Sequence, residues 1–387
     1  MSVEWYVYIL QCADHSFYTG ITTDVNRRFE EHNNNNRLAA KYTRSRRPVT
    51  LLYQETVDSK SAALKRELAI KALNRQQKKA LIQKNDGLQD KLERLRPIYH
   101  AALIEQTIET SPELEQMLET IYLPLASWCL AQKKNGCLII GINGAQGSGK
   151  STLCHILASL LEQGFSQRTL ILSIDDLYKT HTERKQLARD IHPLLQTRGV
   201  PGTHDTRLGI QILEQLKQAQ NTSLLIPRFN KAIDDLYHRD QWTQLRGNID
   251  IILFEGWCVG ATAEDEANLI QPINTLEQDE DPDHSWRQFI NQQLAGSYAE
   301  LFSYIDQQVY LQIPGFFQSI EWRMLQEQKL RTANDSPSSR IMSDQEIQRF
   351  MMHYERISRH CMKTLPKTAD LVLKINEQHD ITEIIRP

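Results

Sequence analysis

The sequence has no long apolar run, and this absence narrows the class of protein. No stretch in its 387 residues approaches the roughly 18 to 20 consecutive apolar residues that a membrane span needs. The first residues, Met1 to Trp5, lack a basic segment followed by an apolar one, so no secretory signal is expected. We therefore predict a cytoplasmic protein with no membrane partner.

Cysteines are few and scattered, without any Cys-x-x-Cys pair. Such a pattern supports neither a disulfide framework nor a zinc site, and we predict reduced, mostly buried thiols. The six positions are Cys12, Cys129, Cys137, Cys154, Cys258 and Cys361.

Charge is distributed unevenly along the chain, although the net charge is only −3. Residues 1–85 carry 15 Lys and Arg against 8 Asp and Glu, a net of +7, while the remainder carries 30 against 40, a net of −10. With 40% hydrophobic residues and a length above that of one usual domain, the chain predicts two folded modules. A basic module that faces a polyanion and an acidic module that handles a small molecule fit this asymmetry.

The first module, residues 1–85, has the pattern of a small α+β domain. Residues 5–10 and 17–22 are rich in β-formers and are separated by a turn-like segment, which predicts a β-hairpin. Asp24 can cap a helix through His32, and Val49 to Glu55 resembles a third strand. A long helix is expected from about Ser59 to Lys84.

The rest of the chain predicts an α/β domain with a parallel sheet. Residues 86–134 have apolar residues at helical spacing, punctuated by Pro97, Pro112 and Pro124, and form a helical linker or the first part of the second domain. Residues 135–387 alternate strand-like and helical patterns. We expect the acidic segment from Glu277 to Asp283 to be a solvated loop. The expected strands are 137–142, 170–174, 249–254, 308–312 and 371–375.

A glycine-rich loop stands between the first of these strands and a helix. Glycines allow the backbone to curl so that its N–H groups point into one concavity, where the helix dipole adds positive potential. Phosphates of ATP fit there, with Lys150 reaching the β- and γ-phosphates and Ser151 offering its hydroxyl to Mg²⁺. The expected nucleotide-binding residues are Gly144, Ala145, Gln146, Gly147, Ser148, Gly149, Lys150, Ser151 and Thr152.

Acidic residues end the next two predicted strands. Asp175 and Asp176 follow residues 170–174, at the edge where open α/β sheets bind ligands. We predict Asp175 as the base for an acceptor hydroxyl, and Asp176 could instead cap the following helix. Glu255 follows residues 249–254 and is suited to orient Mg²⁺ or its water shell.

Loops and one late helix supply cations for an anionic acceptor. Polar and cationic groups among Gly and Pro at residues 192–205 and 227–231 form loops fit to grip a small anion. Arg323, Lys329 and Arg331 have the spacing of a helical lid that closes over phosphates.

Residues 96–387 resemble the D-glycerate 3-kinase family, within the uridine kinase and phosphoribulokinase group. The resemblance rests on Gly-Ala-Gln-Gly-Ser-Gly-Lys-Ser-Thr, Ser-Ile-Asp-Asp-Leu-Tyr, Arg-Gly-Val-Pro-Gly-Thr-His-Asp, Pro-Arg-Phe-Asn-Lys-Ala, Phe-Glu-Gly-Trp and Trp-Arg-x-x-Gln-Glu-x-Lys-Leu-Arg. It implies ATP- and Mg²⁺-dependent phosphorylation of a small hydroxylated molecule, with glycerate as the first candidate. It also implies that Asp175 is the base and that Arg198, His204, Asp205 and Arg228 line the acceptor side.

The basic module has residues suited to phosphodiester hydrolysis. Tyr8 and Tyr18 would lie on neighbouring strands, Arg28 and His32 on one helical face, and Glu67 on the last helix. A phenol, an arginine and a carboxylate for a divalent metal suffice for that chemistry.

Residues 4–82 resemble the GIY-YIG nuclease superfamily, in its small stand-alone bacterial branch. The segments Tyr-Val-Tyr at 6–8, Tyr-Thr-Gly at 18–20, residues 25–32 and Leu-Lys-Arg-Glu-Leu at 64–68 carry the resemblance. It implies metal-dependent DNA cleavage by Tyr8, Tyr18, Arg28, His32 and Glu67.

Two alternatives remain open for the whole chain. It could be a nucleic-acid processing protein that joins a nuclease to a polynucleotide kinase or a regulatory ATPase, or a kinase with a non-catalytic nucleic-acid tether. A basic surface with Tyr42 interleaved supports salt-sensitive nucleic-acid binding in either case. The sequence does not determine the oligomeric state. This surface would consist of Lys41, Arg44, Arg46, Arg47, Lys65, Arg66, Lys71, Arg75, Lys78 and Lys79.

Overall fold

A computed structural model describes residues 4–134, 136–218, 223–333 and 342–386, with side chains described for all of these except 83–87, 89 and 329–333. The chain divides into two compact units, Met1–Arg94 and Leu95–Pro387.

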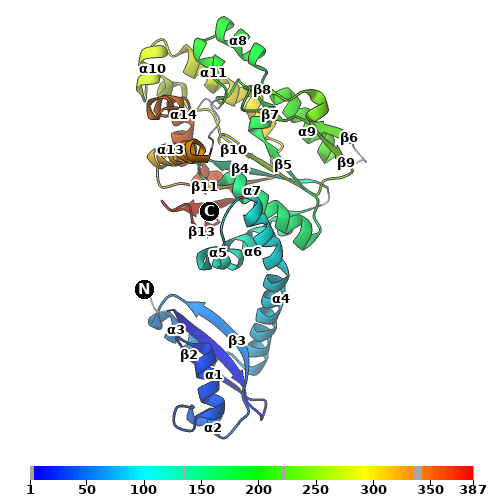
Figure 1. Ribbon diagram of the computed structural model, residues 1–387, viewed down its shortest axis with the longest axis vertical. Coiled ribbons are helices and arrows are strands. Elements are labelled where there is room, and N and C mark those ends of the chain that lie inside the picture. Colours follow the sequence, from blue (N-terminus) through cyan, green and yellow to red (C-terminus); the bar gives the residue numbers. More distant parts are fainter. Residues whose placement is uncertain (1–3, 135, 219–222, 334–341, 387) are drawn as a thin grey trace. The chain divides into compact units, whose positions relative to one another are not determined.

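The first unit is built on a three-stranded antiparallel sheet in the order β2-β1-β3. Successive side chains of the central strand point to opposite faces. Val7 and Ile9 pack with Ile70 of α3, whereas Tyr8 and Leu10 share the other face with Phe29 of α1. The predicted hairpin is therefore present. Its strands and helices are β1 Trp5–Gln11, β2 Phe17–Thr22, α1 Val25–Asn34, α2 Lys41–Arg44, β3 Thr50–Val57 and α3 Lys60–Ala72 (Figure 1).

The long helix expected from Ser59 to Lys84 is wrong, because it is interrupted after Ala72. The Asn74 side chain accepts a hydrogen bond from the Gln77 N–H, and the Gln77 side chain accepts one from the Asn74 N–H. This reciprocal pair is a capping box, which starts a new helix, α4, at Arg75.

Proline has a different effect at each of the three expected helix boundaries. Pro112 is the first residue of α5 (Pro112–Met117), where a missing N–H costs no intrahelical bond. Pro124 lies in the first turn of α6 (Leu123–Gln132), but α6 follows α5 without a break through the π-helical residues Leu118–Tyr122, so the helix does not end at Pro124. Pro97 is instead inside α4 (Arg75–Glu105), so the expectation of a break there is wrong.

The second unit contains a six-stranded sheet in the order β13-β12-β11-β4-β10-β5. The strands β4, β5, β10, β11 and β12 are parallel to one another. The ends of the expected strands agree with theirs to within two residues. The antiparallel edge strand β13 was not predicted. The bounds are β4 Leu138–Gly144, β5 Thr169–Ser173, β10 Ile251–Gly256, β11 Gln307–Gln312, β12 Leu371–Ile375 and β13 Ile381–Ile385; the short pairs are β6 Ser223–Ile226 with β9 Thr243–Arg246, and β7 Phe229–Asn230 with β8 Asp235–Leu236.

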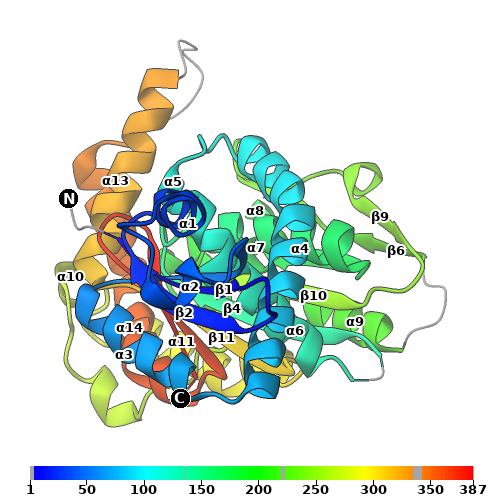
Figure 2. The same ribbon diagram turned by 90° about the horizontal axis from the view of Figure 1, so that it is seen from below.

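Helices cover both faces of this sheet, with α6 on one side and α11 on the other (Figure 1 and Figure 2). Ile252 and Phe254 of β10 share a buried core with Leu213 of α9, Leu301 of α12 and Ile357 of α14. None of the helices in the described part of the chain has the length and apolar character that a bilayer crossing needs. The remaining helices are α7 Lys150–Ser159, α8 His181–Asp190, α9 Thr206–Lys217, α10 Thr275–Glu280, α11 Ser285–Gln293, α12 Ala299–Phe302, α13 Phe316–Ala333 and α14 Asp344–Thr368.

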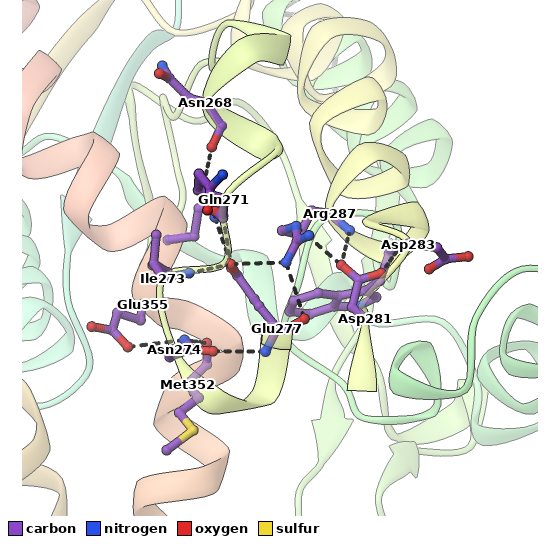
Figure 3. Close-up of polar contacts among 12 residues, drawn as sticks. Asn268, Gln271, Ile273, Asn274, Glu277, Asp281, Asp283, Arg287, Met352 and Glu355 are labelled. Atoms are coloured by element: carbon purple, nitrogen blue, oxygen red, sulfur yellow. Dashed lines mark hydrogen bonds and ion pairs between the residues drawn. The ribbon is translucent and has the colours of Figure 1, made fainter. Parts of the chain in front are cut away.

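The acidic segment from Glu277 to Asp283, expected to be a solvated loop, is solvated only in part: residues up to Glu280 belong to helix α10, and Glu277 and Asp281 are buried while the other five residues are exposed. Glu277 and Asp281 are both fully buried. Arg287 of α11 lies between them, 3.4 Å from each carboxylate, as Figure 3 shows. Arg356 of α14 also contacts Glu277, with a nitrogen–oxygen distance of 2.6 Å. The segment is polar and acidic, but Arg287 of the next helix and Arg356 of α14 make burial of the Glu277 and Asp281 side chains favourable.

Candidate active site

The glycine-rich loop lies between β4 and α7, where the sequence placed it. Its four residues Ala145–Ser148 form a turn closed by the Ser148 N–H, which donates to the Ala145 carbonyl at 3.1 Å. Gly147, the third residue of this turn, has φ +77°, and Gly149 has φ +82°, a region that favours glycine. A side chain at Gly144 would lie 2.5 Å from Ser148 Oγ, so the tight curl of the loop also requires glycine there.

Polar atoms around this loop are available for a nucleotide and a metal ion. Within the described part of the chain, Ser148 Oγ and Glu255 Oε2 are buried without a hydrogen-bond partner. Ser151 Oγ lies 3.4 Å from Glu255 Oε1. A hydroxyl beside a carboxylate matches the oxygen ligands that Mg²⁺ takes together with phosphates and water. The residues present therefore fit ATP and Mg²⁺.

Asp175 is a part-buried carboxylate held by two contacts at the end of β5. The Tyr178 hydroxyl donates to Oδ1 and the Lys231 ammonium to Oδ2, each at 2.8 Å. Burial raises the pKa of this carboxyl, but the Lys231 and Lys150 charges and the Tyr178 hydroxyl outweigh it and hold the pKa at about 2. Asp175 is therefore ionised at neutral pH and can accept a proton.

Asp176 has a different set of partners from its neighbour. It binds the Arg228 guanidinium at 2.6 Å and accepts a hydrogen bond from the Phe229 N–H at 3.1 Å. Its carboxylate therefore fixes the loop before β7. Of the two adjacent acids, Asp175 alone lines the cavity described next.

One cavity of about 440 Å³ brings the nucleotide loop and several predicted residues together. From the predicted nucleotide and metal groups it is lined by Gln146, Gly147, Gly149, Lys150, Ser151, Thr152 and Glu255, and from the other groups by Asp175, Arg198 and Arg323. Arg198 forms an ion pair with Asp234, and Arg323 pairs with Glu327 at 2.8 Å. The lid residues Lys329 and Arg331 belong to α13, but their side chains lie outside the described residues.

The other three residues expected on the acceptor side do not line this cavity. His204 is buried behind it, where its ring stacks on Tyr178 at 4.5 Å and its Nδ1 is 2.5 Å from the Tyr298 hydroxyl. Burial lowers the pKa of His204 to about 3, so its ring is neutral. Asp205 caps α9 by accepting from the Leu208 N–H, and Arg228 binds Asp176.

Several side chains that line the cavity were not named as site residues from the sequence. Lys231 and Tyr178 contact Asp175, while Gln326, Phe350 and Tyr354 come from α13 and α14. Lys231 stands next to the Arg-Phe-Asn segment and was open to prediction from it. Gln326 stands in the Trp-Arg-x-x-Gln-Glu segment of α13 and was equally open to prediction. Phe350 and Tyr354 of α14 carry no comparable motif, because only the packing of this helix brings them to the loop.

In the first unit, Tyr8, His32 and Thr43 form a chain of hydrogen bonds. The Thr43 hydroxyl donates to the Ala40 carbonyl, so its oxygen accepts from His32 Nδ1, 2.7 Å away. His32 Nε2 is then free of a proton and accepts from the Tyr8 hydroxyl at 2.9 Å. Burial and the Arg28 charge lower the pKa of His32 to about 4, which keeps it a neutral acceptor.

The remaining predicted nuclease residues surround Tyr8. The ring of Tyr18 lies 6.3 Å from that of Tyr8, and a side chain at Gly20 would meet the Tyr8 hydroxyl at 2.5 Å. Burial is the main cause that raises the pKa of Tyr8; the neighbouring Tyr18 and Glu67 also raise it, and Arg28 lowers it. All five predicted residues therefore lie within electrostatic reach of one phenol. Glu67 itself pairs with Lys71 at 2.8 Å.

Part of the predicted basic surface is neutralised within the fold. Arg46 pairs with Asp14, Arg66 with Glu55, and Lys71 with Glu67. Arg47 donates to the backbone carbonyls of His32 and Asn35 and is therefore structural. Among the side chains that the structure describes, the cations of this surface that pair with no carboxylate are, besides Arg47, Lys41, Arg44, Lys65, Arg75, Lys78 and Lys79.

These features define a P-loop phosphotransferase. A phosphate-binding loop lies at the carboxyl edge of a parallel sheet and carries a lysine and a hydroxyl, and the adjacent strand supplies an acid. Residues of the second unit are 32% identical over 224 residues to an uncharacterized kinase, mug58, of Schizosaccharomyces pombe, covering 56% of this chain and 78% of the relative. They are 28% identical over 252 residues to the chloroplastic D-glycerate 3-kinase of Arabidopsis thaliana, covering 60% of this chain and about half (52%) of that one. The D-glycerate 3-kinase structure from Cryptococcus neoformans shares the fold, with a TM-score of 0.59 at 24% identity over 69% of this chain and 99% of that one.

The first unit matches a different family. Residues 4–80 match the GIY-YIG catalytic domain. They are also similar to a UPF0213 protein of Desulfotalea psychrophila, at 52% identity over 82 residues, which cover 21% of this chain and 74% of the relative. The second unit therefore belongs to the family of P-loop kinases that includes mug58 and is similar to D-glycerate 3-kinases, and the chain carries an N-terminal GIY-YIG domain. Both family predictions made from the sequence are confirmed.

Proposed function

We propose that the kinase unit transfers the γ-phosphate of ATP to a hydroxyl of a small anionic acceptor, with D-glycerate, giving 3-phosphoglycerate, as the first candidate. The observation that carries this proposal is Asp175, an ionised carboxylate in the same cavity as Lys150 and Ser151. The relatives named D-glycerate 3-kinase support the choice of acceptor.

The residues of the site divide the work of phosphoryl transfer. Mg²⁺, held by Ser151 and Glu255, would neutralise charge on the ATP phosphates. Lys150 is positioned to bind the phosphates, and Asp175 accepts the proton of the acceptor hydroxyl as attack develops. Such general-base assistance typically contributes about 10²- to 10⁴-fold in rate.

The charges around Asp175 favour an acceptor that is itself an anion. Lys231, Arg198 and Arg323 line the cavity together with Lys150. Lys231 is 65% exposed in its side chain and contacts Asp175 from the open side, so an incoming carboxylate can reach it. A small hydroxy acid satisfies both requirements, because its hydroxyl can face Asp175 while its carboxylate meets a cation.

The first test is ATP consumption with D-glycerate, uridine, pantothenate, ribulose 5-phosphate and a 5′-hydroxyl oligonucleotide. We expect turnover with D-glycerate alone. Asp175→Asn should lower kcat by about 10²- to 10⁴-fold with little change in the KM for ATP. Asp176→Asn, which keeps the base and loosens the Arg228 loop, should retain most of kcat. Equal kcat losses in the two variants would contradict the assignment of the base.

A polynucleotide kinase or regulatory ATPase is the alternative for this unit. Residues 86–387 carry a net charge of −10, whereas a protein that binds polynucleotide ends needs a basic path beside its P-loop. Turnover with the oligonucleotide and not with D-glycerate would establish this alternative.

We further propose that the GIY-YIG unit cleaves DNA with a divalent metal ion, and that Glu67 is the metal ligand. The hydrogen-bonded series from Tyr8 through His32 to Thr43 supports catalysis, because it gives the phenol a neutral acceptor for its proton. A non-catalytic tether would need no such arrangement.

We expect the protein to act in the cytoplasm, without a membrane partner.

Plasmid nicking with Mg²⁺ or Mn²⁺ tests this second proposal. Glu67→Gln should reduce nicking by at least about 10²-fold while DNA binding is kept. Glu93→Gln, an exposed acid on α4, is the matched control and should nick normally. DNA binding without nicking by the wild type would make this unit a tether.

A further inference from the structure

The turn between β12 and β13 reaches the phosphate-binding loop. His379 in this turn has its Nε2 2.9 Å from the carbonyl oxygen of Gly147. A carbonyl only accepts hydrogen bonds, so Nε2 carries the proton and donates it. Gly147 is the positive-φ residue of the turn Ala145–Ser148, and a bond to its carbonyl fixes the orientation of the peptide plane between Gly147 and Ser148.

The same histidine also contacts the helix that borders the cavity. Its ring stacks on Trp322 of α13 with centroids 3.9 Å apart and an interplanar angle of 30°. Trp322 Nε1 donates to the carbonyl of Glu377 in the same turn at 3.3 Å. The tryptophan is thus held to the turn by a stack and a hydrogen bond.

Trp322 also contacts the phosphate-binding loop directly. A side chain at Gly147 would lie 2.8 Å from Trp322 Cβ, so the tryptophan packs directly on the loop. The next residue, Arg323, lines the cavity. The P-loop, the β12–β13 turn and α13 therefore meet at one point, at which a shift of any one of them must displace the other two.

Hydrogen bonds within the β12–β13 turn fix its conformation. The Asn376 side chain accepts from the Gln378 and Asp380 N–H groups, at 3.0 and 2.8 Å, and the Asn376 N–H donates to the Asp380 carbonyl. His379 is held at φ +71° by this arrangement. The imidazole is therefore presented to Gly147 from a preformed turn.

We propose that His379 is a positioning residue for the phosphate-binding loop, and that with Trp322 it couples the seating of that loop to the position of α13. This inference rests on the proposed function in that it assumes the loop binds ATP. Its predicted effect falls on nucleotide affinity and not on the acceptor or on Asp175.

The test compares ATP binding, measured by calorimetry without acceptor, and steady-state kinetics in a set of full-length variants. His379→Ala should weaken ATP binding and raise the KM for ATP by about tenfold, the effect of losing one positioning hydrogen bond, with the KM for the acceptor unchanged. His379→Gln, which restores an N–H donor, should recover most of the affinity. His238→Ala, at an exposed histidine of the same unit, is the control and should bind ATP as the wild type does.

Coupling to α13 is tested by the double variant. The loss caused by His379→Ala should be smaller in a Trp322→Ala background than in the wild type, because the two residues act together. Additive losses would overturn the coupling. The positioning role would be overturned if His379→Ala bound ATP with unchanged affinity. It would also be overturned if His379→Gln were as defective as His379→Ala while its melting temperature was unaltered. Failure of the wild type to use D-glycerate while it binds ATP would refute only the proposed acceptor, and failure to bind ATP would refute both proposals.

Discussion

At the scale of single residues, Lys231 determines the electrostatic state of Asp175. The ammonium lies 2.8 Å from the carboxylate and is the largest of the influences that lower its pKa. Because the pKa of about 2 in the folded state is below the usual value near 4, this interaction stabilises the fold above pH 4. That stabilisation is lost as the pH falls from about 4 to about 2.

Replacement of Lys231 by Met should raise the pKa of Asp175 because a neighbouring positive charge is removed. We expect the pH below which kcat/KM for phosphorylation falls to rise by about one pH unit. A nearby opposite charge shifts a carboxyl pKa by about one to three units, and the lower end applies here because Lys231 is exposed to solvent. Activity measured from about pH 2 to pH 6 gives the shift, because the fall should move from about pH 2 to about pH 3. Lys185→Met, at an exposed position on α8, should leave the profile unchanged, and the same result for Lys231→Met would contradict our account.

At the scale of elements, a buried ionic network joins α10, α11 and α14. Glu277 is fully buried, and Arg287 contacts both Glu277 and Asp281 (Figure 3). Glu277 also contacts Arg356 of α14. Buried charges are tolerated only when they are paired, so each member depends on the others. The network holds α14, which contributes Phe350 and Tyr354 to the cavity, against the smaller helices.

Glu277→Gln should therefore destabilise the second unit by about 3 kcal/mol, because it removes the carboxylate shared by the buried Arg287 and the part-buried Arg356. The loss is at the lower end for a broken buried pair, since Arg287 keeps Asp281 and Arg356 keeps Glu264. The free energy of unfolding from urea denaturation measures the loss. Glu280→Gln is the matched control, because Glu280 is on the same helix as Glu277 but forms an exposed ion pair, with Arg349 of α14. Its loss should cost only about 0–1 kcal/mol. Equal losses in the two variants would mean that the network is not a stabilising feature.

At the scale of the whole molecule, the chain contains two compact units, each with its own set of candidate catalytic groups. The basic unit contains the Tyr8 site, and the acidic unit contains the P-loop and Asp175. Nothing in either set of residues requires a group from the other unit, so the two activities should be separable by single substitutions.

Lys150→Ala should abolish phosphoryl transfer and leave plasmid nicking at the wild-type rate, while Glu67→Gln should do the reverse. Parallel assays of the two activities on the same preparations give the comparison. A fall in ATP turnover in Glu67→Gln, at an unchanged melting temperature, would instead reveal coupling between the units.

The sequence by itself determined the features that depend on local chemistry. The P-loop follows from glycines and a lysine at fixed spacing, the parallel strands from short apolar runs, and the Tyr8 site from residues on a hairpin and the helix that follows it. In each case the residues that act together lie close in the chain or at the ends of adjacent strands, so their type and spacing are enough.

Only the tertiary structure decided which side chains meet across long separations in the chain. It gave Asp175 and Asp176 different partners, placed His204 behind the cavity, and buried the Glu277 segment against Arg287 and Arg356. It also brought His379 to Gly147, 232 residues away in the chain. These contacts depend on how helices and turns pack, and composition and periodicity carry no record of that packing.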